Sequence, residues 1–502
     1  MGVRSIGIDL SLQSKHRAEA LDESGNRCGH LSFRTTPEGL EGLAKLCSQS
    51  ESSLTVVMEP TGLAWLPIAL FLRARFPEAV LVRAKEQKVV GLRRFLGGPA
   101  KSDRLDAITL AKLPLLDPEH LTPLILPSPE MECLDRLTRR RDRLAASIGT
   151  RKTRIAALLL GWFPGLWDCF EDPWNPRARW VYRRKLSPFQ LAKLAPSRLK
   201  ESLRRAAPGS SEAVIEREAQ AIKSWSKQCA RVYQPALRSG LLTRELLSTW
   251  QGEIVLELDL LELEESQDQR LREEIQELYQ KVHPRGDLET IPGIGPRIAP
   301  LLLAAIGDIH RFPNAKALCQ WAGVMPRSHQ SSHTQRLGLG MTKAGPARVK
   351  RALYQAAHYA RIWDPGLGAI YYRQMVELGK THKQAMGVVM SHLLRRVYTV
   401  LKEERTYQLR DLEGNPVTMV AARELIREQL RVPEEVRRLR RHHNRPKKKE
   451  NLPPEVPFPS SGRGGKTTVH EAANAPQRGL PASTRKELTK LSATAQSHPF
   501  TS

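Results

Sequence analysis

The chain has 502 residues, 40% of them hydrophobic, which is enough for two or three domains with their own cores. Its 79 lysine and arginine residues outnumber 53 acidic residues, and the formal net charge is +26. This excess indicates a polyanionic partner, because each neutralised phosphate releases condensed counterions. No run of about 18 apolar residues exists, so we expect no membrane span. The six cysteines lack the paired spacing of a zinc site or a disulfide framework, which favours a reduced, cytoplasmic protein.

Residues 1–128 predict an α/β domain. Three β-rich segments, at residues 4–10, 16–21 and 29–34, are followed by a helix from 37 to about 48. The remaining elements alternate: a buried strand at 54–59, a helix at 63–76, a strand at 79–82 and two helices ending near 112. A meander of three strands followed by alternating strands and helices is the order of an RNase H-like fold.

Residues 129–286 show helical periodicity instead. Leucine and isoleucine recur at spacings of four and seven around residues 137–159 and again around 254–278. Two long amphipathic helices that flank a stretch containing Trp and Pro predict a helical coiled-coil arm with an insertion at about 160–250. A plain helical bundle fits the same pattern.

Residues 287–404 predict a mainly α-helical C-terminal domain. The segment Ile291-Pro-Gly293-Ile-Gly295-Pro-Arg297 is typical of a helix-hairpin-helix, whose glycines allow a tight turn with backbone N–H groups facing a phosphate. We therefore expect this turn to contact the DNA backbone regardless of base sequence, although an ordinary connection between helices fits as well. The basic segment that follows Met341 adds four candidate DNA-binding residues: Lys343, Arg348, Lys350 and Arg351.

Residues 405–502 predict a basic, largely disordered tail. A block of arginines and lysines at 437–449 precedes a stretch at 451–502 that is rich in Pro, Ser, Gly and Thr and has no apolar periodicity. Such a tail adds non-specific affinity for nucleic acid.

Four acidic residues stand at informative places in the N-terminal domain. Asp9 and Glu59 each end a predicted strand, and Asp103 and Asp106 are spaced to share one face of a helix. Hard divalent cations such as Mg²⁺ or Mn²⁺ prefer oxygen ligands, and two such ions can activate one oxygen and stabilise the leaving one in phosphodiester cleavage. Taken singly, each acid is typical of a turn or of the protein surface, but the four together indicate a metal site.

The three blocks Ile6-Gly-Ile-Asp9, Glu59-Pro-Thr-Gly and Lys101-Ser-Asp103-Arg-Leu-Asp106 resemble those of the RuvC-like domain in DEDD-type insertion-sequence transposases. The catalytic core of that family is similar to that of Holliday-junction resolvases. The resemblance implies that Asp9, Glu59, Asp103 and Asp106 are the catalytic, metal-binding acids.

The C-terminal half resembles the serine transposase domain of the same family, in which a serine attacks DNA and forms a covalent link. The matching position is Ser331. The glycine that usually follows is Ser332 here, so Ser332 is an alternative nucleophile. The family's turn with lysine and glycine reads Lys343-Ala-Gly-Pro.

The resemblance implies a recombinase that cuts and rejoins double-stranded DNA at element ends and at a target site, at the nucleoid. Family members act as dimers or tetramers, and some are guided by a structured non-coding RNA; the residues do not decide whether this chain uses one. Two other functions fit part of the sequence. One is a resolvase-like nuclease in which water attacks, and the other is a non-catalytic DNA-binding protein.

Overall fold

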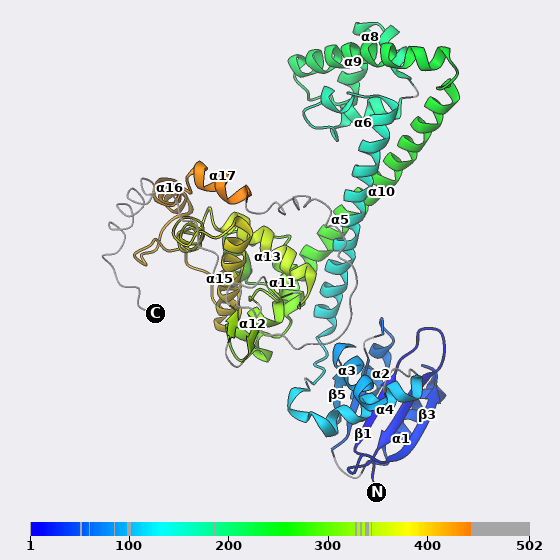
Figure 1. Ribbon diagram of the computed structural model, residues 1–502, viewed down its shortest axis with the longest axis vertical. Coiled ribbons are helices and arrows are strands. Elements are labelled where there is room, and N and C mark those ends of the chain that lie inside the picture. Colours follow the sequence, from blue (N-terminus) through cyan, green and yellow to red (C-terminus); the bar gives the residue numbers. More distant parts are fainter. Residues whose placement is uncertain are drawn as a thin grey trace, which may run out of the picture. The chain divides into compact units, whose positions relative to one another are not determined.

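The computed structural model describes residues 2–50, 53–59, 61–84, 86–97, 102–121, 123–184, 186–326, 329–331, 334–336, 341–342 and 344–442. Within these ranges no helix has both the length and the apolar character needed to cross a bilayer. A mixed α/β region comes first in the chain, and helices dominate the rest (Figure 1).

The N-terminal region contains a five-stranded sheet in the order β3-β2-β1-β4-β5. β1, β2 and β3 form an antiparallel meander, whereas β4 and β5 run parallel to β1. The strands are β1 (Ser5–Asp9), β2 (His16–Leu21), β3 (Arg27–Phe33), β4 (Thr55–Met58) and β5 (Val80–Arg83). This order and these directions are consistent with the RNase H-like fold that the sequence predicts.

Helices cover the sheet, and side-chain caps fix the first turns of two of them. The helices are α1 (Pro37–Cys47), α2 (Trp65–Arg75), α3 (Glu86–Gly97) and α4 (Asp103–Leu116). The Thr36 hydroxyl accepts from the N–H of Gly39 to start α1, and the Ser102 hydroxyl accepts from the N–H of Leu105 to start α4. A short 3₁₀ turn, η1 (Pro118–His120), follows α4. Ile6 and Ile8 of β1 are fully buried in the core that the sheet shares with its helices.

Two long helices, α5 (Pro129–Trp162) and α10 (Arg244–Val282), lie side by side (Figure 1). Ion pairs join Arg141 to Asp268 at 3.0 Å and Arg151 to Glu257 at 2.8 Å. Residue numbers rise along one helix as they fall along the other, so the pair is antiparallel. The predicted helices are therefore present, and their supercoiling as a coiled coil stays a prediction.

The chain between these helices forms a small helical region with its own core. It contains η2 (Trp167–Cys169), α6 (Pro176–Arg183), α7 (Pro188–Lys193), α8 (Pro196–Ala206) and α9 (Glu212–Arg238). Trp162, the last residue of α5, is fully buried in this core together with Phe163, Tyr182 and residues of α10. Trp162 is thus a core residue, and Pro176, Pro188 and Pro196 start helices.

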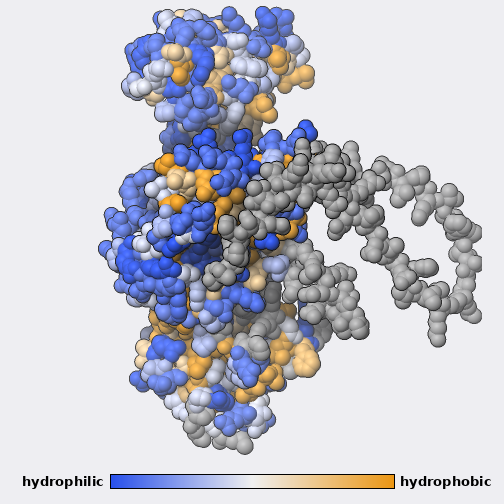
Figure 2. Space-filling model, turned by 90° about the vertical axis from the view of Figure 1, so that its left-hand side faces the viewer, coloured by the Kyte–Doolittle hydropathy of each residue, from blue (hydrophilic) through white to orange (hydrophobic). Residues whose placement is uncertain are grey.

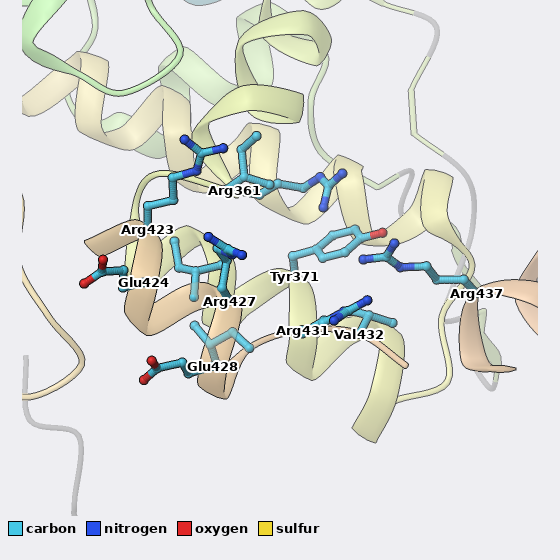
Figure 3. A pocket seen from close by; sticks show the side chains of 13 residues that line it. Arg361, Tyr371, Arg423, Glu424, Arg427, Glu428, Arg431, Val432 and Arg437 are labelled. Carbon is cyan, nitrogen blue, oxygen red and sulfur yellow. The ribbon is translucent and has the colours of Figure 1, made fainter. Parts of the chain in front are cut away.

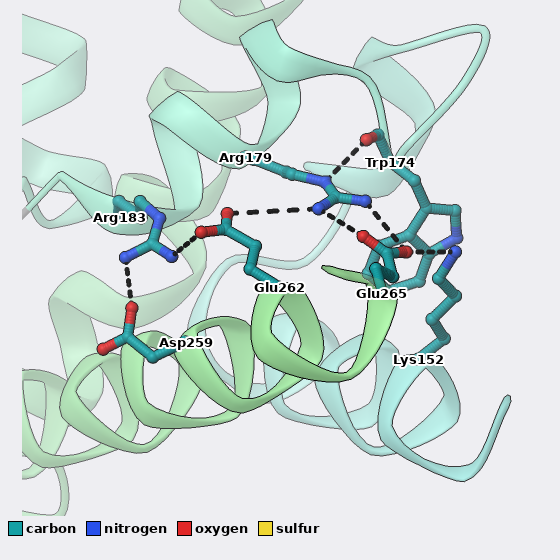
Figure 4. Close-up of polar contacts among 7 residues, drawn as sticks. All are labelled: Lys152, Trp174, Arg179, Arg183, Asp259, Glu262 and Glu265. Carbon is teal, nitrogen blue, oxygen red and sulfur yellow. Dashed lines mark hydrogen bonds and ion pairs between the residues drawn. The ribbon is translucent and has the colours of Figure 1, made fainter. Parts of the chain in front are cut away.

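Charged pairs attach α6 to the long helices (Figure 4). Arg183 pairs with Asp259 and with Glu262 of α10. Arg179 pairs with Glu265 at 2.8 Å, and Lys152 of α5 reaches the same carboxylate at 3.0 Å. One carboxylate on α10 is therefore shared by side chains from two other helices, which fixes how α6 lies on the antiparallel pair.

The remaining described chain is mainly helical. Its elements are η3 (Asp287–Thr290), α11 (Ala299–Ile306), η4 (Ile309–Arg311), α12 (Ala315–Ala322), α13 (Ala347–Ala360), α14 (Pro365–Tyr372), a π-helical turn (Arg373–Glu377) and α15 (His382–Glu403), together with the hairpin strands β6 (His329–Ser331) and β7 (Thr334–Arg336). A single core contains α11–α15 and also the ends of the long helices, through Leu134, Ile275 and Tyr279. The face in Figure 2 is mostly hydrophilic with scattered hydrophobic patches.

The prediction of a largely disordered tail from residue 405 is wrong for residues 405–442. This segment contains α16 (Met419–Gln429) and α17 (Glu434–His442). Ala422 and Ile426, one helical turn apart, are buried, and the hydroxyl of Tyr407 donates to the buried carboxylate of Asp364 at 2.7 Å. A few apolar contacts and one buried polar network are enough to order a segment whose composition is strongly basic. Residues 443–502 lie outside the described residues.

Candidate active site

The first two acids are placed by the register of two parallel strands. Ile8 of β1 pairs with Met58 of β4. Asp9 and Glu59 each follow immediately, so they stand at the same edge of the sheet on adjacent strands, which are about 4.8 Å apart. The sequence prediction that both acids end strands is confirmed for Asp9, the last residue of β1; Glu59 lies one residue beyond β4.

The other two acids are placed by helix α4. Asp103 and Asp106 occupy its first turn; Asp103 is exposed and Asp106 is buried. Helix α4 lies directly on β1, because the Ser5 hydroxyl donates to the carbonyl of Ala111 at 2.7 Å and Gly7 leaves no side chain in the way. Ser5, Gly7 and Asp9 alternate onto one face of the strand, so this packing directs the start of α4 toward the end of β1.

All four predicted acids line one cavity of about 590 Å³. Residues 10–15, between β1 and β2, form one wall, and Val90 and Arg93 of α3 form another. The structure thus brings into one cavity residues that are far apart in the sequence, since 97 positions separate Asp9 from Asp106.

The loop at residues 10–15 is held by one buried histidine. Nδ1 of His16 accepts from the backbone N–H of Ser11 at 3.2 Å, and Nε2 lies 2.8 Å from the hydroxyl of Thr35. The Ser11 hydroxyl in turn accepts from the backbone N–H of Ser14 at 3.0 Å. Burial lowers the pKa of His16, which favours the neutral ring that this hydrogen bond requires.

Arg93 is a charged residue of the cavity that the sequence analysis missed. Its Nη1 lies 2.9 Å from Oδ1 of Asp106, and both side chains are largely buried. Lys15 adds a second positive charge to the lining. In a chain with 79 lysines and arginines, neither residue has a spacing that could have marked it in the sequence.

The donor set suits a hard divalent cation, because the cavity offers carboxylate oxygens and no thiol or imidazole among its lining residues. Within the described residues, however, no three His, Cys, Asp or Glu side chains are grouped as a metal cluster. One reason is visible in the structure: the carboxylate of Asp106 is paired with Arg93. A cation held by all four acids would have to share the carboxylate of Asp106 with Arg93 or take the place of Arg93.

The predicted nucleophile lies in a different part of the chain. Ser331 is the last residue of β6 and pairs with Thr334 of β7, so the backbone makes a tight hairpin there. Ser332 and Lys343 lie outside the described residues, as does the side chain of Ser331. The choice between the two serines therefore stays open.

The base of this hairpin is closed by two glycines. A Cβ on Gly323, which ends α12 with φ +69°, would lie 1.9 Å from the carbonyl oxygen of Ala344. A Cβ on Gly345, with φ +83°, would lie 2.5 Å from the carbonyl oxygen of Trp321. The glycine of the Lys-Ala-Gly-Pro turn is thus required by close backbone packing that joins the two ends of the segment.

Three of the cations predicted to bind DNA have partners within the protein. Lys350 donates to the carbonyl of Ala344 at 2.9 Å, next to the glycine turn. Arg348 pairs with Asp135 of α5, and Arg351 lies 3.4 Å from Asp142 of the same helix. These contacts attach α13 to α5, and DNA contact by the three cations stays a prediction.

The turn at Gly293 also serves packing. A Cβ there would lie 2.3 Å from the carbonyl oxygen of Ala356 on α13, whereas Gly295 faces open space and Arg297 is exposed. The chain enters this turn from the four-residue η3 and leaves it through α11. A helix-hairpin-helix in which two full helices flank the turn is thus not seen, and phosphate contact by this turn stays a prediction.

Two family models match the chain. A model of the DEDD transposases of the IS110 type, described as "Transposase", matches residues 6–164, and one described as "Transposase IS116/IS110/IS902 family" matches residues 286–372. The first match contains all four acids and the second contains Ser331.

Among curated relatives, the chain is 26% identical over 412 residues to the "Insertion element IS110 uncharacterized 43.6 kDa protein" of Streptomyces coelicolor, covering 81% of this chain and 95% of that protein. It is 34% identical over 128 residues to the "Pilin gene-inverting protein" of Moraxella bovis, covering 26% of this chain and 40% of that protein. It is also 34% identical over 70 residues to the "Transposase for insertion sequence element IS1111A" of Coxiella burnetii, covering 14% of this chain and 19% of that protein. Together these matches support an IS110-family DEDD transposase, an enzyme that cleaves and transfers DNA.

Proposed function

We propose that this protein cuts and rejoins double-stranded DNA at the ends of its own insertion sequence and at a target site. The observation that carries the proposal is the shared cavity of Asp9, Glu59, Asp103 and Asp106. Negative charge directed at DNA weakens simple binding, so a passive binder gains nothing from four carboxylates that line one cavity.

In this proposal the four acids hold Mg²⁺ or Mn²⁺, and DEDD transposases as a family use a divalent metal. When bound, such ions activate an attacking oxygen and stabilise the leaving one. The chain's own contribution is to fix the carboxylates: β1 and β4 set Asp9 and Glu59 side by side, and the N-cap at Ser102 fixes the first turn of α4. Arg93 balances the buried charge of Asp106 until the cation takes its place.

Ser331 is the proposed nucleophile, with Ser332 as the alternative. The serine oxygen forms a bond to phosphorus, the bond from phosphorus to one strand oxygen breaks, and the serine proton ends on that leaving oxygen. The reverse exchange with another strand end releases the serine. Since each step exchanges one phosphodiester bond for another, strands are rejoined without ATP. A dimer or tetramer suits this reaction, because two DNA ends and a target must be held together.

The test is a covalent adduct assay. Purified protein is incubated with Mg²⁺ and a duplex containing the DNA that flanks the gene, with and without the RNA transcribed from that flank. Wild type is compared with Ser331→Ala, Ser332→Ala, Asp9→Asn and, as a matched control at the exposed end of α9, Ser239→Ala. We expect a protease-sensitive protein–DNA adduct in wild type and Ser239→Ala that is lost in Ser331→Ala and Asp9→Asn.

Each other outcome has a definite meaning. Loss of the adduct only in Ser332→Ala moves the nucleophile by one residue. Metal-dependent nicking that survives both serine substitutions supports the resolvase-like nuclease. Full activity in Asp9→Asn overturns the metal site, and an adduct that needs the transcribed RNA establishes RNA guidance.

A further inference from the structure

A second cavity, of about 780 Å³, lies in the C-terminal helical region, remote in sequence from the four acids. Its walls come from the end of α13, from α14 and from α16 and α17. Its volume is that of a ligand pocket. The two elements that close it, α16 and α17, begin at Met419, well beyond the residues that the family models match.

Five arginines line this cavity: Arg361, Arg423, Arg427, Arg431 and Arg437. Among the described residues, only Arg437 forms an ion pair, a distant one of 3.9 Å to Glu434. The other four have no carboxylate partner in the described part of the chain, unlike the three arginines of α6. The two acids of the lining, Glu424 and Glu428, project from α16 away from the guanidinium groups near Tyr371 (Figure 3).

Arg361 is the deepest of these cations. Its Nε is buried and has no hydrogen-bond partner among the described residues. Burial, with the positive charge of Arg437 nearby, lowers the pKa of Arg361, so the two guanidinium groups repel each other in a partly dehydrated site. An anion between them would relieve this repulsion and supply the missing acceptor.

The aromatic rings at the site are already occupied. The guanidinium of Arg361 lies 4.5 Å from the ring centre of Tyr371, and that of Arg423 lies 4.5 Å from the ring centre of Trp363. Stacking on a ring orients the planar guanidinium and leaves its N–H groups free at the edge. One face of each ring is thus taken by a guanidinium, and the paired N–H groups of these guanidinium groups match phosphate oxygens.

We propose that this arginine cavity binds backbone phosphates of a nucleic acid strand, without reading its bases. The basic character of the whole chain favours a polyanion over a small free anion. The inference rests on the proposed function only in that the protein acts on nucleic acid. It involves neither the four acids nor either serine, so it can fail while the proposed chemistry stands.

The test measures binding without cleavage. Fluorescence anisotropy in EDTA gives the affinity of the full chain for a labelled DNA duplex and, in a separate arm, for the RNA transcribed from the flanking DNA, at several salt concentrations. The variant is Arg427→Ala with Arg431→Ala, two exposed cavity residues. The matched control is Arg231→Ala with Arg238→Ala, which removes the same charge from the exposed surface of α9.

We expect the cavity variant to bind more weakly in one or both arms. The slope of log affinity against log salt should fall by about 1 to 2, corresponding to one or two lost phosphate contacts. The arm that changes identifies whether DNA or RNA supplies the phosphate. An unchanged slope in both arms, or an equal fall in the control, overturns the proposal. Thermal unfolding checks the fold, and if it shows destabilisation, Arg427→Lys with Arg431→Lys keeps the charge and should keep the slope.

Discussion

Gly7 on β1 and Ala107 on α4 approach so closely that a Cβ added to Gly7 would lie 2.1 Å from the carbonyl oxygen of Ala107. The same added Cβ would lie 2.3 Å from the backbone nitrogen of Ala111. Both contacts are with helix backbone, so no side-chain rotation can relieve them. The missing side chain of Gly7 therefore determines how near the first turn of α4, with its two acids, comes to Asp9.

Gly7→Ala should lower the free energy of unfolding by about 1–3 kcal/mol, the usual cost of overpacking a core. Because α4 must shift, metal-dependent cleavage should fall as well, even under conditions where the variant is folded. Urea unfolding and the cleavage assay measure the two effects. Gly149→Ala is the control, since a Cβ there meets no atom within 4 Å and the residue lies inside α5. It should raise stability by about 0.5–1 kcal/mol; a similar gain in Gly7→Ala would contradict the packing argument.

Arg93→Met should make stability depend more strongly on the metal. Without Arg93 the buried carboxylate of Asp106 loses its charge partner, which should cost about 1–3 kcal/mol in EDTA. A divalent cation that binds the four acids supplies a new partner. Magnesium should therefore raise the melting temperature of Arg93→Met more than that of wild type. Arg94→Met, at an exposed neighbouring position of α3, should respond like wild type. Equal responses in all three proteins would sink the idea that Arg93 and the cation compete for Asp106.

Much of the N-terminal domain could be predicted from the sequence, because its strands are short apolar runs that end at turns. Residues 16–21 were expected as a strand and form β2 with those bounds. Asp9 and Glu59 could be found because each stands at the end of an apolar run that predicts a strand, and Asp103 and Asp106 because their spacing places them on one face of a helix. Arg93 could not, because its importance comes from a tertiary contact with Asp106, 13 residues away on another helix.

In the C-terminal region, contacts between residues far apart in the sequence made the sequence-based predictions less accurate. The sequence predicts that Arg348, which lies on a basic helix, binds DNA. In the structure its guanidinium pairs with Asp135, 213 residues earlier in the chain. A local charge pattern does not reveal an acid on a distant helix. Likewise, the basic composition beyond residue 405 predicts disorder, because it gives no weight to the few apolar residues, such as Ile426, that are buried when α16 packs.

His16 should make stability fall in mild acid. Its pKa in the folded protein is lowered by burial from the usual value of about 6.5. The unfolded chain therefore binds the proton first as pH drops below about 6.5, and stability falls until pH passes the lower, folded pKa. His16→Gln should reduce the loss of stability between pH 7.5 and pH 5, measured by urea unfolding. His30→Gln, at an exposed position of β3, should not. If both substitutions change the loss equally, the effect does not come from the buried ring.

The contact of α13 with α5 offers a matched pair of arginines. Arg348 pairs with Asp135 and is 3.1 Å from the Thr138 hydroxyl, with only 10% of its side chain exposed. Arg351 is 60% exposed and lies 3.4 Å from Asp142. Removing a charge from a largely buried pair leaves its partner uncompensated, whereas an exposed pair contributes about 0–1 kcal/mol. Arg348→Met should therefore cost several times more stability than Arg351→Met in urea unfolding. If instead Arg348→Met left stability unchanged and weakened DNA binding, Arg348 would be a DNA contact, as the sequence predicts, and the pair with Asp135 would be incidental.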